Sequence, residues 1–517
     1  MSAPGKVLFL LHAHLPFVRH PEHSRFFEEN WFFEALSETY IPLVQALRRL
    51  LEKGVPGTLN LSISPPLIEM LSDSHLIEKF SKHLYYQKEL AEKELQRFSE
   101  SAEGKLARFY AERLGALIDT WENRIKKDLL GEFLALERLG KLNLLTCVGT
   151  HPYLPAYQSD FASIHRQLAI TVKCFERAFK RKPKGVWLPE CGYFPSLDEL
   201  LAGYGFRYFF LETHGSLLAT PPPKYGVFSP MQTKSGLFCL GREQKSSREV
   251  WSRETGYPGH PEYREFFKDI ANERERSYLG EYFYSGETPI HTGLKYWRIT
   301  GNENKALYNP WNANRLVSNH SRTFIAEREG TFLDLIPRME GNPATMLCPY
   351  DAELFGHWWF EGPLFLESML EEAAGSSILE FVGADSVMEN SADGELHSPA
   401  FSSWGEGGFG SVWINSETDF YYPMGKKMQL MFEALSKKRH TPFLKRLLKQ
   451  LEREIMLFQS SDWAFMIHNH SAEGYARKRL EEHYSNACAL FELGMSKTRD
   501  NGILASLEKK NNIFHWM

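Results

Sequence analysis

Short runs of apolar residues recur through residues 1–400, and a polar turn marked by proline or glycine ends each run. Continuous apolar runs of this length are typical of parallel strands buried on both faces. Helical patterns such as SLDELLAGYG lie between them, so strand and helix alternate. The pattern predicts an α/β fold, a (β/α)7 TIM-like barrel, from seven runs: KVLFLLHAHLPF, TLNLSISPPL, LNLLTCVGTHPYLP, KGVWLPECGYFP, FRYFFLETHG, GLFCLGREQ and ATMLCPYDAELFGHWW.

Two regions depart from this alternation. The chain has no proline between Pro66 and Pro152, and the segment is charged and helical, which predicts a helical insertion over residues 70–140. After Ser403 the apolar residues follow a helical period, as in TPFLKRLLKQLEREIMLF. We therefore expect a catalytic barrel domain over residues 1–400 and an all-helical domain over 401–517 that contributes to the active site.

Composition narrows the class of protein. A formal net charge of -5 argues against nucleic acid as a partner, because phosphate binding needs a concentrated basic face. Six cysteines without a CxxC pair fit a reducing compartment. No apolar segment reaches the length of a bilayer span. We expect a soluble cytoplasmic protein with no membrane or nucleic-acid partner; a monomer is compatible with the sequence, which leaves the oligomeric state open.

Titratable residues follow the predicted strands. In α/β barrels the loops at the carboxyl ends of the strands build the active site. Side chains alternate along a strand, so His12 and His14 are expected to point to the same side, towards the floor of a pocket. The residues placed at strand ends are His12, His14, His151, Glu190, His214, Arg242, Glu243 and Asp351.

Two segments contain the strongest candidates for catalytic residues. In VWLPECGY, Glu190 stands between Pro189 and Cys191, where a rigid, partly apolar setting suits a nucleophile or a tuned acid. A structural ion pair with an arginine explains Glu190 equally well. In YDAELFGHWWFEG, Asp351 follows an apolar run. Glycoside hydrolysis needs two carboxyl groups across the scissile bond, and Glu190 with Asp351 could supply them.

Tryptophan clusters beside polar residues indicate a surface for stacking a sugar ring. Trp251 lies in VWSRETGYPGHPEYREFF, and Trp404 and Trp413 lie in SSWGEGGFGSVW. GEGGFG lacks the strand before it and the Lys-Ser/Thr after it that a phosphate-binding loop requires. We interpret it as a loop that carries a tryptophan platform, and Asp462 in QSSDWAFMI is a further candidate from the helical domain.

Two other classes of protein remain open on the residues alone. His12, His14 and His151, with His214 and Asp351, could ligate metal in a hydrolase or deacetylase. A non-catalytic glucan-binding module would use the tryptophans and leave the carboxyl groups without a role. Neither alternative explains WLPECGY together with the tryptophan clusters.

The segments HAHLP, GTHPYLP, WLPECGY, YDAELFGHWWFEG and SSDWAF, in this order, resemble the five sequence regions of glycoside hydrolase family 57. The match runs from near residue 7 to about residue 490 and is nearest to the branching and α-amylase-like members. The resemblance implies a (β/α)7 barrel, an α-1,4-glucan substrate such as amylose or glycogen, and retaining chemistry without a metal or cofactor. It implies branching, with hydrolysis as the alternative.

The resemblance also implies roles for individual residues. Glu190 would be the nucleophile and Asp351 the general acid/base. The family's active-site histidines match His12, His14 and His151, which are expected to bind the sugar next to the scissile bond. The resemblance matches Arg242, Gly259, Trp404 and Asp462 to positions where branching members contact substrate, and the tryptophan clusters add Trp251 and Trp413 as expected substrate contacts. Branching members carry a tyrosine thought to cover the site, and Tyr225 in PPPKYGVF is the candidate here.

Overall fold

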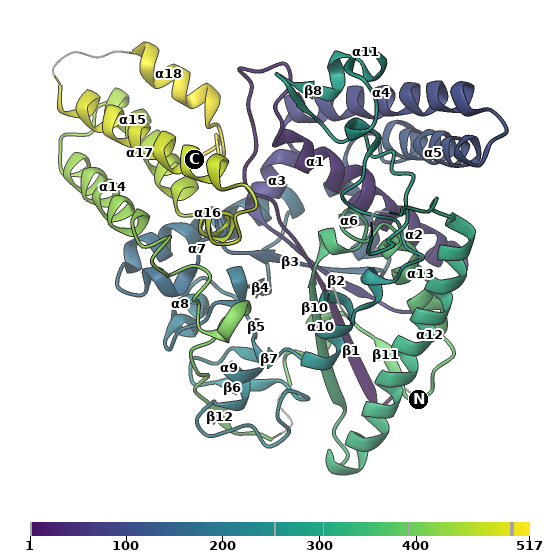
Figure 1. Ribbon diagram of the computed structural model, residues 1–517. Helices are drawn as coiled ribbons and strands as arrows, with labels where there is room; N and C mark the ends of the chain where they lie inside the picture. The colour runs from purple at the N-terminus through teal and green to yellow at the C-terminus, as the bar shows by residue number, and fades with distance from the viewer. Residues whose placement is uncertain (1–2, 253–254, 303, 391–392, 497–500) are drawn as a thin grey trace.

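The computed structural model describes residues 3–252, 255–302, 304–390, 393–496 and 501–517 (Figure 1). At its centre a curled sheet runs in the order β10-β1-β2-β3-β4-β5-β7, with every pair parallel. In the described part of the chain these strands are β1 (Gly5–Ala13), β2 (Leu59–Ile63), β3 (Leu142–Cys147), β4 (Gly185–Trp187), β5 (Tyr208–Leu211), β7 (Phe238–Gly241) and β10 (Ala344–Asp351).

The ring closes through a narrow seam. A single parallel bridge joins Arg242, directly after β7, to Leu347 in β10. The amide of Glu243 donates to the Leu347 carbonyl at 2.9 Å beside it. The sheet therefore closes on itself as the (β/α)7 barrel that the apolar runs predict.

Short strands extend this barrel. Beyond β7, β6 (Met231–Thr233) pairs antiparallel with it, and β12 (Leu396–His397) pairs with β6. A further strand, β11 (Leu379–Phe381), pairs with the start of β1. A separate hairpin consists of β8 (Tyr284–Ser285) and β9 (Thr288–Pro289).

Burial explains why β1 is almost continuously apolar. It lies between β2 and β10 and is covered on both faces, so nearly every side chain is buried. Its register pairs His12 with Asp351 on one side and with Ser62 on the other. Polar residues therefore begin where the three strands reach the carboxyl end of the barrel.

Helices surround the sheet, and several begin at side chains that cap their free amide groups. Asp160 accepts from the amide of Ser163, and Asn309 accepts from the amides of Trp311 and Asn312. The helices are α1 (Glu29–Glu34), α2 (Ile41–Glu52), α3 (Pro65–Leu71), α6 (Leu129–Arg138), α7 (Phe161–Phe179), α8 (Leu197–Gly203), α9 (Thr213–Leu217), α10 (Gln244–Trp251), α12 (Pro310–Leu335) and α13 (Gly362–Ala373).

Within the predicted insertion, α4 (Ser74–Phe98) and α5 (Ala102–Asp119) form a helical hairpin at the upper right of Figure 1. A second segment, which the sequence did not predict as a unit, covers this hairpin. It includes α11 (Arg276–Leu279), β8 and β9. Arg274 pairs with buried Glu94 at 3.1 Å, and the Gln87 amide donates to the Thr292 carbonyl at 2.9 Å.

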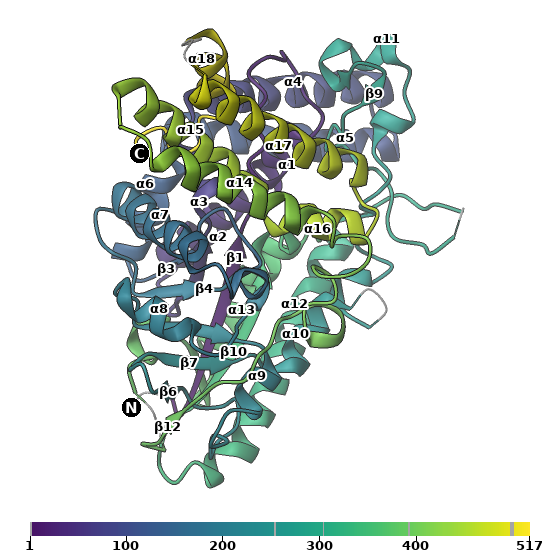
Figure 2. The same ribbon diagram turned by 90° about the vertical axis from the view of Figure 1, so that its left-hand side faces the viewer.

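The C-terminal helices cover the carboxyl end of the barrel, opposite the N-terminus (Figures 1 and 2). Two backbone contacts fix them to the barrel. Pro152 and Ser460 form an antiparallel bridge, and the Ser461 amide donates to the His151 carbonyl at 2.8 Å. They are α14 (Tyr421–Ser436), α15 (Pro442–Phe458), α16 (Ser461–His468), α17 (Glu473–Met495) and α18 (Asn501–Lys510). Among the described residues, no helix combines the length and the apolar character needed to cross a bilayer.

Candidate active site

A cavity of about 860 Å³ opens at the carboxyl ends of the barrel strands, beneath the C-terminal helices. The barrel strands, the loop after β12 and helix α16 all contribute to its wall. Most of the residues selected from the sequence meet here. They are His12, His14, His151, Glu190, Arg242, Trp251, Asp351, Trp404, Trp413 and Asp462.

Glu190 stands in a tight turn directly after β4. Its backbone has φ 57°, in the left-handed region that residues other than glycine rarely adopt. The amide of Cys191 closes the turn by donating to the Leu188 carbonyl at 2.8 Å. Such strain persists only where the surroundings enforce it, and it is common at functional sites.

Two donors hold the Glu190 carboxylate, and both lie in the C-terminal part of the chain. The Trp404 indole donates to Oε2 at 2.8 Å, and the Ser461 hydroxyl donates to Oε1 at 2.7 Å. Burial raises the pKa of Glu190, while these two hydrogen bonds oppose the rise. A carboxylate oriented by two donors is suited to nucleophilic attack.

Asp351 ends β10. Burial raises its pKa well above the ordinary value, and the negative charges of Glu353 and Glu190 raise it further, against the opposing effect of Arg242. A carboxyl group with a raised pKa is suited to protonate a leaving group. Burial thus raises the pKa values of both carboxyl groups, and it raises that of Asp351 more strongly.

The three histidines form one hydrogen-bonded cluster. His12 and His151 share a contact between their Nε2 atoms at 3.0 Å, and His14 stacks on His151 with ring centres 3.7 Å apart. The Nε2 atom of His14 lies 3.1 Å from Oδ2 of Asp462. Their Nδ1 atoms are held by hydroxyl groups of Ser62, Ser64 and Ser461.

The ionised group in contact with this cluster is the Asp462 carboxylate. Burial lowers the pKa values of His12 and His151 well below the ordinary value, so both rings are neutral near pH 7. Burial acts to raise the pKa of Asp462, but the charge and hydrogen bond of His14 lower it to about 2. The Asp462 carboxylate therefore stays ionised and orients His14.

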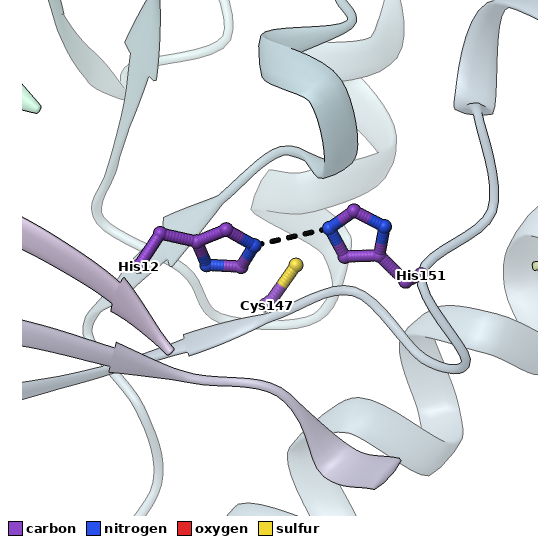
Figure 3. A group of neighbouring side chains, drawn as sticks. All are labelled: His12, Cys147 and His151. Carbon is purple, nitrogen blue, oxygen red and sulfur yellow. Dashed lines mark hydrogen bonds between the residues drawn. The ribbon is translucent and has the colours of Figure 1, made fainter. Parts of the chain in front are cut away.

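The same cluster offers metal ligands. The ring nitrogens of His12 and His151 and the sulfur of Cys147 lie within 4.8 Å of one another (Figure 3). His14, His151 and Asp462 form a second such group. Imidazole, thiolate and carboxylate are zinc ligands. A metal at the first group would break the His12–His151 hydrogen bond and deprotonate a thiol whose pKa burial raises. The protein side chains already saturate one another here.

Comparison with known proteins decides the family. Residues 8–329 match the protein family described as Glycosyl hydrolase family 57. Residues 423–517 match the family described as 1,4-alpha-glucan branching enzyme, C-terminal. The chain belongs to family 57. A 1,4-alpha-glucan branching enzyme of Thermococcus kodakarensis is 30% identical over 99% of this chain and 77% of that protein.

Two solved structures share the fold along nearly the whole chain. The alpha-amylase AmyC from Thermotoga maritima has a TM-score of 0.91 and 36% identity, covering 99% of this chain and 98% of that one. The family 57 branching enzyme from Pyrococcus horikoshii has a TM-score of 0.87 and 30% identity, covering 99% and 95%. Relatives of both names thus share this architecture.

The tryptophans that the sequence clusters placed at the cavity differ in exposure. Trp251 is 44% exposed and meets Trp404 edge to face, with ring centres 6.2 Å apart. Trp413 is only 1% exposed and stacks on Tyr153 at 4.9 Å. Trp251 therefore offers an open ring face, whereas Trp413 supports the wall from within.

Four positions raised by the sequence lie outside this lining, and one of them, Glu243, caps α10 by accepting from the amides of Lys245 and Ser246. Gly259 is not among the described residues that line the cavity, and it stands in the turn Tyr257–Gly259 after α10. The Tyr225 hydroxyl donates to exposed Glu340 at 3.2 Å, so this tyrosine does not cover the cavity described here. His214 contacts the Gly408 carbonyl at 2.8 Å and lies outside that lining as well.

Two residues at the site were missed from the sequence. Glu212 is buried after β5 and pairs with Arg242 at 2.8 Å, which orients the guanidinium beside Asp351. Ser461 contacts both Glu190 and His151. Glu212 is the first polar residue of FFLETHG, and Ser461 precedes Asp462, so position at a strand end or beside a candidate was the available signal.

Proposed function

We propose that this protein is a 1,4-alpha-glucan branching enzyme, a retaining transglycosylase that cleaves α-1,4 and forms α-1,6 linkages. The observation that supports this most is the pair of carboxyl groups in one cavity. Glu190 is held by two donors, which suits a nucleophile, and the pKa of Asp351 is raised by burial, which suits an acid. Family 57 relatives named as branching enzymes match along the chain.

In the first displacement, a Glu190 oxygen attacks the anomeric carbon of an α-1,4-linked glucose. The carbon–oxygen bond to the leaving chain breaks, and Asp351 gives its proton to the departing 4-oxygen. The product is a glycosyl ester on Glu190 with a free glucan end. This step needs Glu190 ionised and Asp351 protonated.

In the second displacement, the ionised Asp351 removes the proton from a glucan 6-hydroxyl. That oxygen attacks the anomeric carbon, and the ester bond to Glu190 breaks, which restores both carboxyl groups. Two inversions retain the α configuration. When water takes the place of the 6-hydroxyl, the same step gives hydrolysis.

The histidine cluster fits a role in holding the donor sugar beside Glu190. The three rings line the cavity, and hydrogen bonds to neighbouring side chains fix their orientation, so they give the donor sugar a rigid surface to lie against. The contact of Ser461 with both His151 and Glu190 links the sugar-holding group to the nucleophile. Positioning of this kind lowers the barrier to attack.

Hydrolysis of α-1,4-glucans is the second candidate function. It is favoured by the position of Tyr225, which lies away from the cavity and so does not exclude water there. The structural likeness to a protein named as an alpha-amylase supports it as well. Both candidates use the same carboxyl pair and differ in the acceptor.

Incubation with amylose separates the two. We expect new α-1,6 linkages, measured by proton NMR, to outnumber new reducing ends. Glu190→Gln, which keeps the shape of the side chain, serves as the blank. Reducing ends that rise without α-1,6 linkages would contradict branching and leave hydrolysis by the same residues.

A further inference from the structure

One end of the cavity carries aromatic rings that belong neither to the carboxyl pair nor to the histidine cluster. Trp358 is 52% exposed and stacks on Phe266, with ring centres 4.3 Å apart and planes inclined by 25°. The adjacent Phe267 is 64% exposed. All three line the cavity. Large rings that are held in place and yet face solvent form an apolar surface to which a ligand can bind.

A polar group lies at the same end. The Asn30 amide donates to Oε1 of Glu34 at 2.8 Å, and Nδ1 atoms of His291 and His357 each approach the Glu34 carboxylate at 3.5 Å. These four side chains also line the cavity. They come from α1, from the segment that covers the helical hairpin, and from the loop after β10.

In this group, Oδ1 of Asn30 is buried without a hydrogen-bond partner, and Asn30 is only 5% exposed. Buried polar atoms in native proteins nearly always have partners, and a missing one is a free-energy cost that a ligand can relieve. The histidine cluster shows no such vacancy, because each of its ring nitrogens is partnered.

The position of Trp358 relative to the carboxyl pair indicates which substrate binds at this end of the cavity. The loop after Asp351 turns through Glu353, whose carbonyl accepts from the Trp358 amide at 3.1 Å. In a double displacement the acid/base stands on the side where the leaving chain departs and the acceptor enters. Glu190, by contrast, is held from the C-terminal part of the chain.

We infer that Trp358 and Phe266, together with Asn30, Glu34 and His357, form the binding site for the acceptor glucan chain. The stacked rings pack against the C–H face of a glucose unit. The amide, carboxylate and imidazole bind its hydroxyl groups, one of which donates to the unpartnered Oδ1 of Asn30. This inference rests on the proposed function and names the residues that bring the second substrate to the site.

The test uses α-maltotriosyl fluoride as donor, because fluoride leaves without occupying the acceptor site. Maltooligosaccharides are added as acceptors, and transfer and hydrolysis products are quantified together. For Trp358→Ala we expect the acceptor concentration at half-maximal transfer to rise about tenfold, and the ratio of transfer to hydrolysis at fixed acceptor to fall about tenfold. Glu34→Gln, which changes charge but little shape, should lower the same ratio.

Trp311→Ala is the matched control, since Trp311 is 64% exposed on α12 and is not among the described residues lining the cavity. Its ratio of transfer to hydrolysis should equal that of the unmodified protein. If Trp358→Ala and Glu34→Gln leave the ratio unchanged, or lower transfer and hydrolysis in proportion, the acceptor site is contradicted. If the unmodified protein forms no α-1,6 product at any acceptor concentration, the proposed function fails before any variant is compared.

Discussion

The histidine cluster and the polar group beside Trp358 differ in how completely the protein pairs their atoms. In the cluster, every ring nitrogen of His12, His14 and His151 has a partner. Beside Trp358, Oδ1 of Asn30 is buried without one, and half of the tryptophan is exposed.

This difference indicates which polar groups of the site are already paired before substrate binds. Groups that stabilise a transition state act best when they are already oriented, because they then need no reorganisation during the reaction. Groups that exchange one chain for another must release what they bind. We interpret the histidine end as the fixed frame for chemistry and the Trp358 end as a surface completed by each incoming glucan.

The largest effect is expected at the nucleophile, where the fixed frame meets the bond that breaks. Glu190→Gln should lower kcat by about 10⁴-fold, because the amide cannot form the glycosyl ester. The assay is glucan consumption under saturating amylose. Glu406→Gln, at an 84% exposed carboxylate in the loop after Trp404, is the matched control. Activity of Glu190→Gln within tenfold of the unmodified protein would remove Glu190 from the chemistry.

A smaller loss is expected when the frame is loosened without touching the carboxyl pair. Asp462→Asn should lower kcat by about 10²-fold, because His14 loses the charge that orients it. The substitutions Asp462→Asn and His14→Ala should be non-additive when combined, since each removes the same contact. Additive losses would show that the two residues act independently.

The pH dependence sharpens the comparison within the carboxyl pair. Activity should fall on the acid side as Glu190 gains a proton, and on the alkaline side as Asp351 loses one, because the pKa values of both groups are raised by burial. The two limbs belong to the coupled pair. With the fluoride donor, whose leaving group needs no acid, the unmodified protein should lose the alkaline limb. An alkaline limb that persists with this donor would assign it to another group.

Stability should respond in the opposite direction to activity. A raised pKa means that the folded state binds the Asp351 proton more tightly than the unfolded chain does, so stability falls as pH rises from the unfolded pKa through the folded one. Asp351→Asn should therefore raise the free energy of unfolding at pH 8 by about 1 kcal/mol and have less effect at pH 4. Thermal unfolding at both pH values measures this, and a loss of stability at pH 8 would contradict it.

The smallest effect is expected from chelation. Treatment with a strong zinc chelator should leave activity within about twofold, because the proposed mechanism uses carboxyl groups and the candidate ligands His12 and His151 bond to each other. Elemental analysis provides the second readout. Stoichiometric zinc whose removal abolishes activity would favour the metal-dependent hydrolase that the histidines left open.

Sequence patterns predicted the barrel and the carboxyl pair for the same reason. Strands buried on both faces must be continuously apolar, so the first titratable residue after each run marks the open end of the barrel, as with Glu190 and Asp351. The segment that carries Phe266 has no such period. Its conformation depends on tertiary contacts such as the ion pair of Arg274 with Glu94. Likewise, whether Trp413 is exposed depends on Tyr153, which is distant in the sequence.

The most direct measurement of the central claim is the mass of Asp351→Asn after incubation with α-maltotriosyl fluoride. This variant can form the glycosyl ester, because fluoride leaves without an acid, but it lacks the base that removes the ester. The account predicts one maltotriosyl adduct, located on the peptide that contains Glu190 and absent when Glu190→Gln is added. An adduct on any other residue would contradict it. Turnover of the fluoride by Asp351→Asn without an adduct would contradict it as well, if that turnover still depends on Glu190.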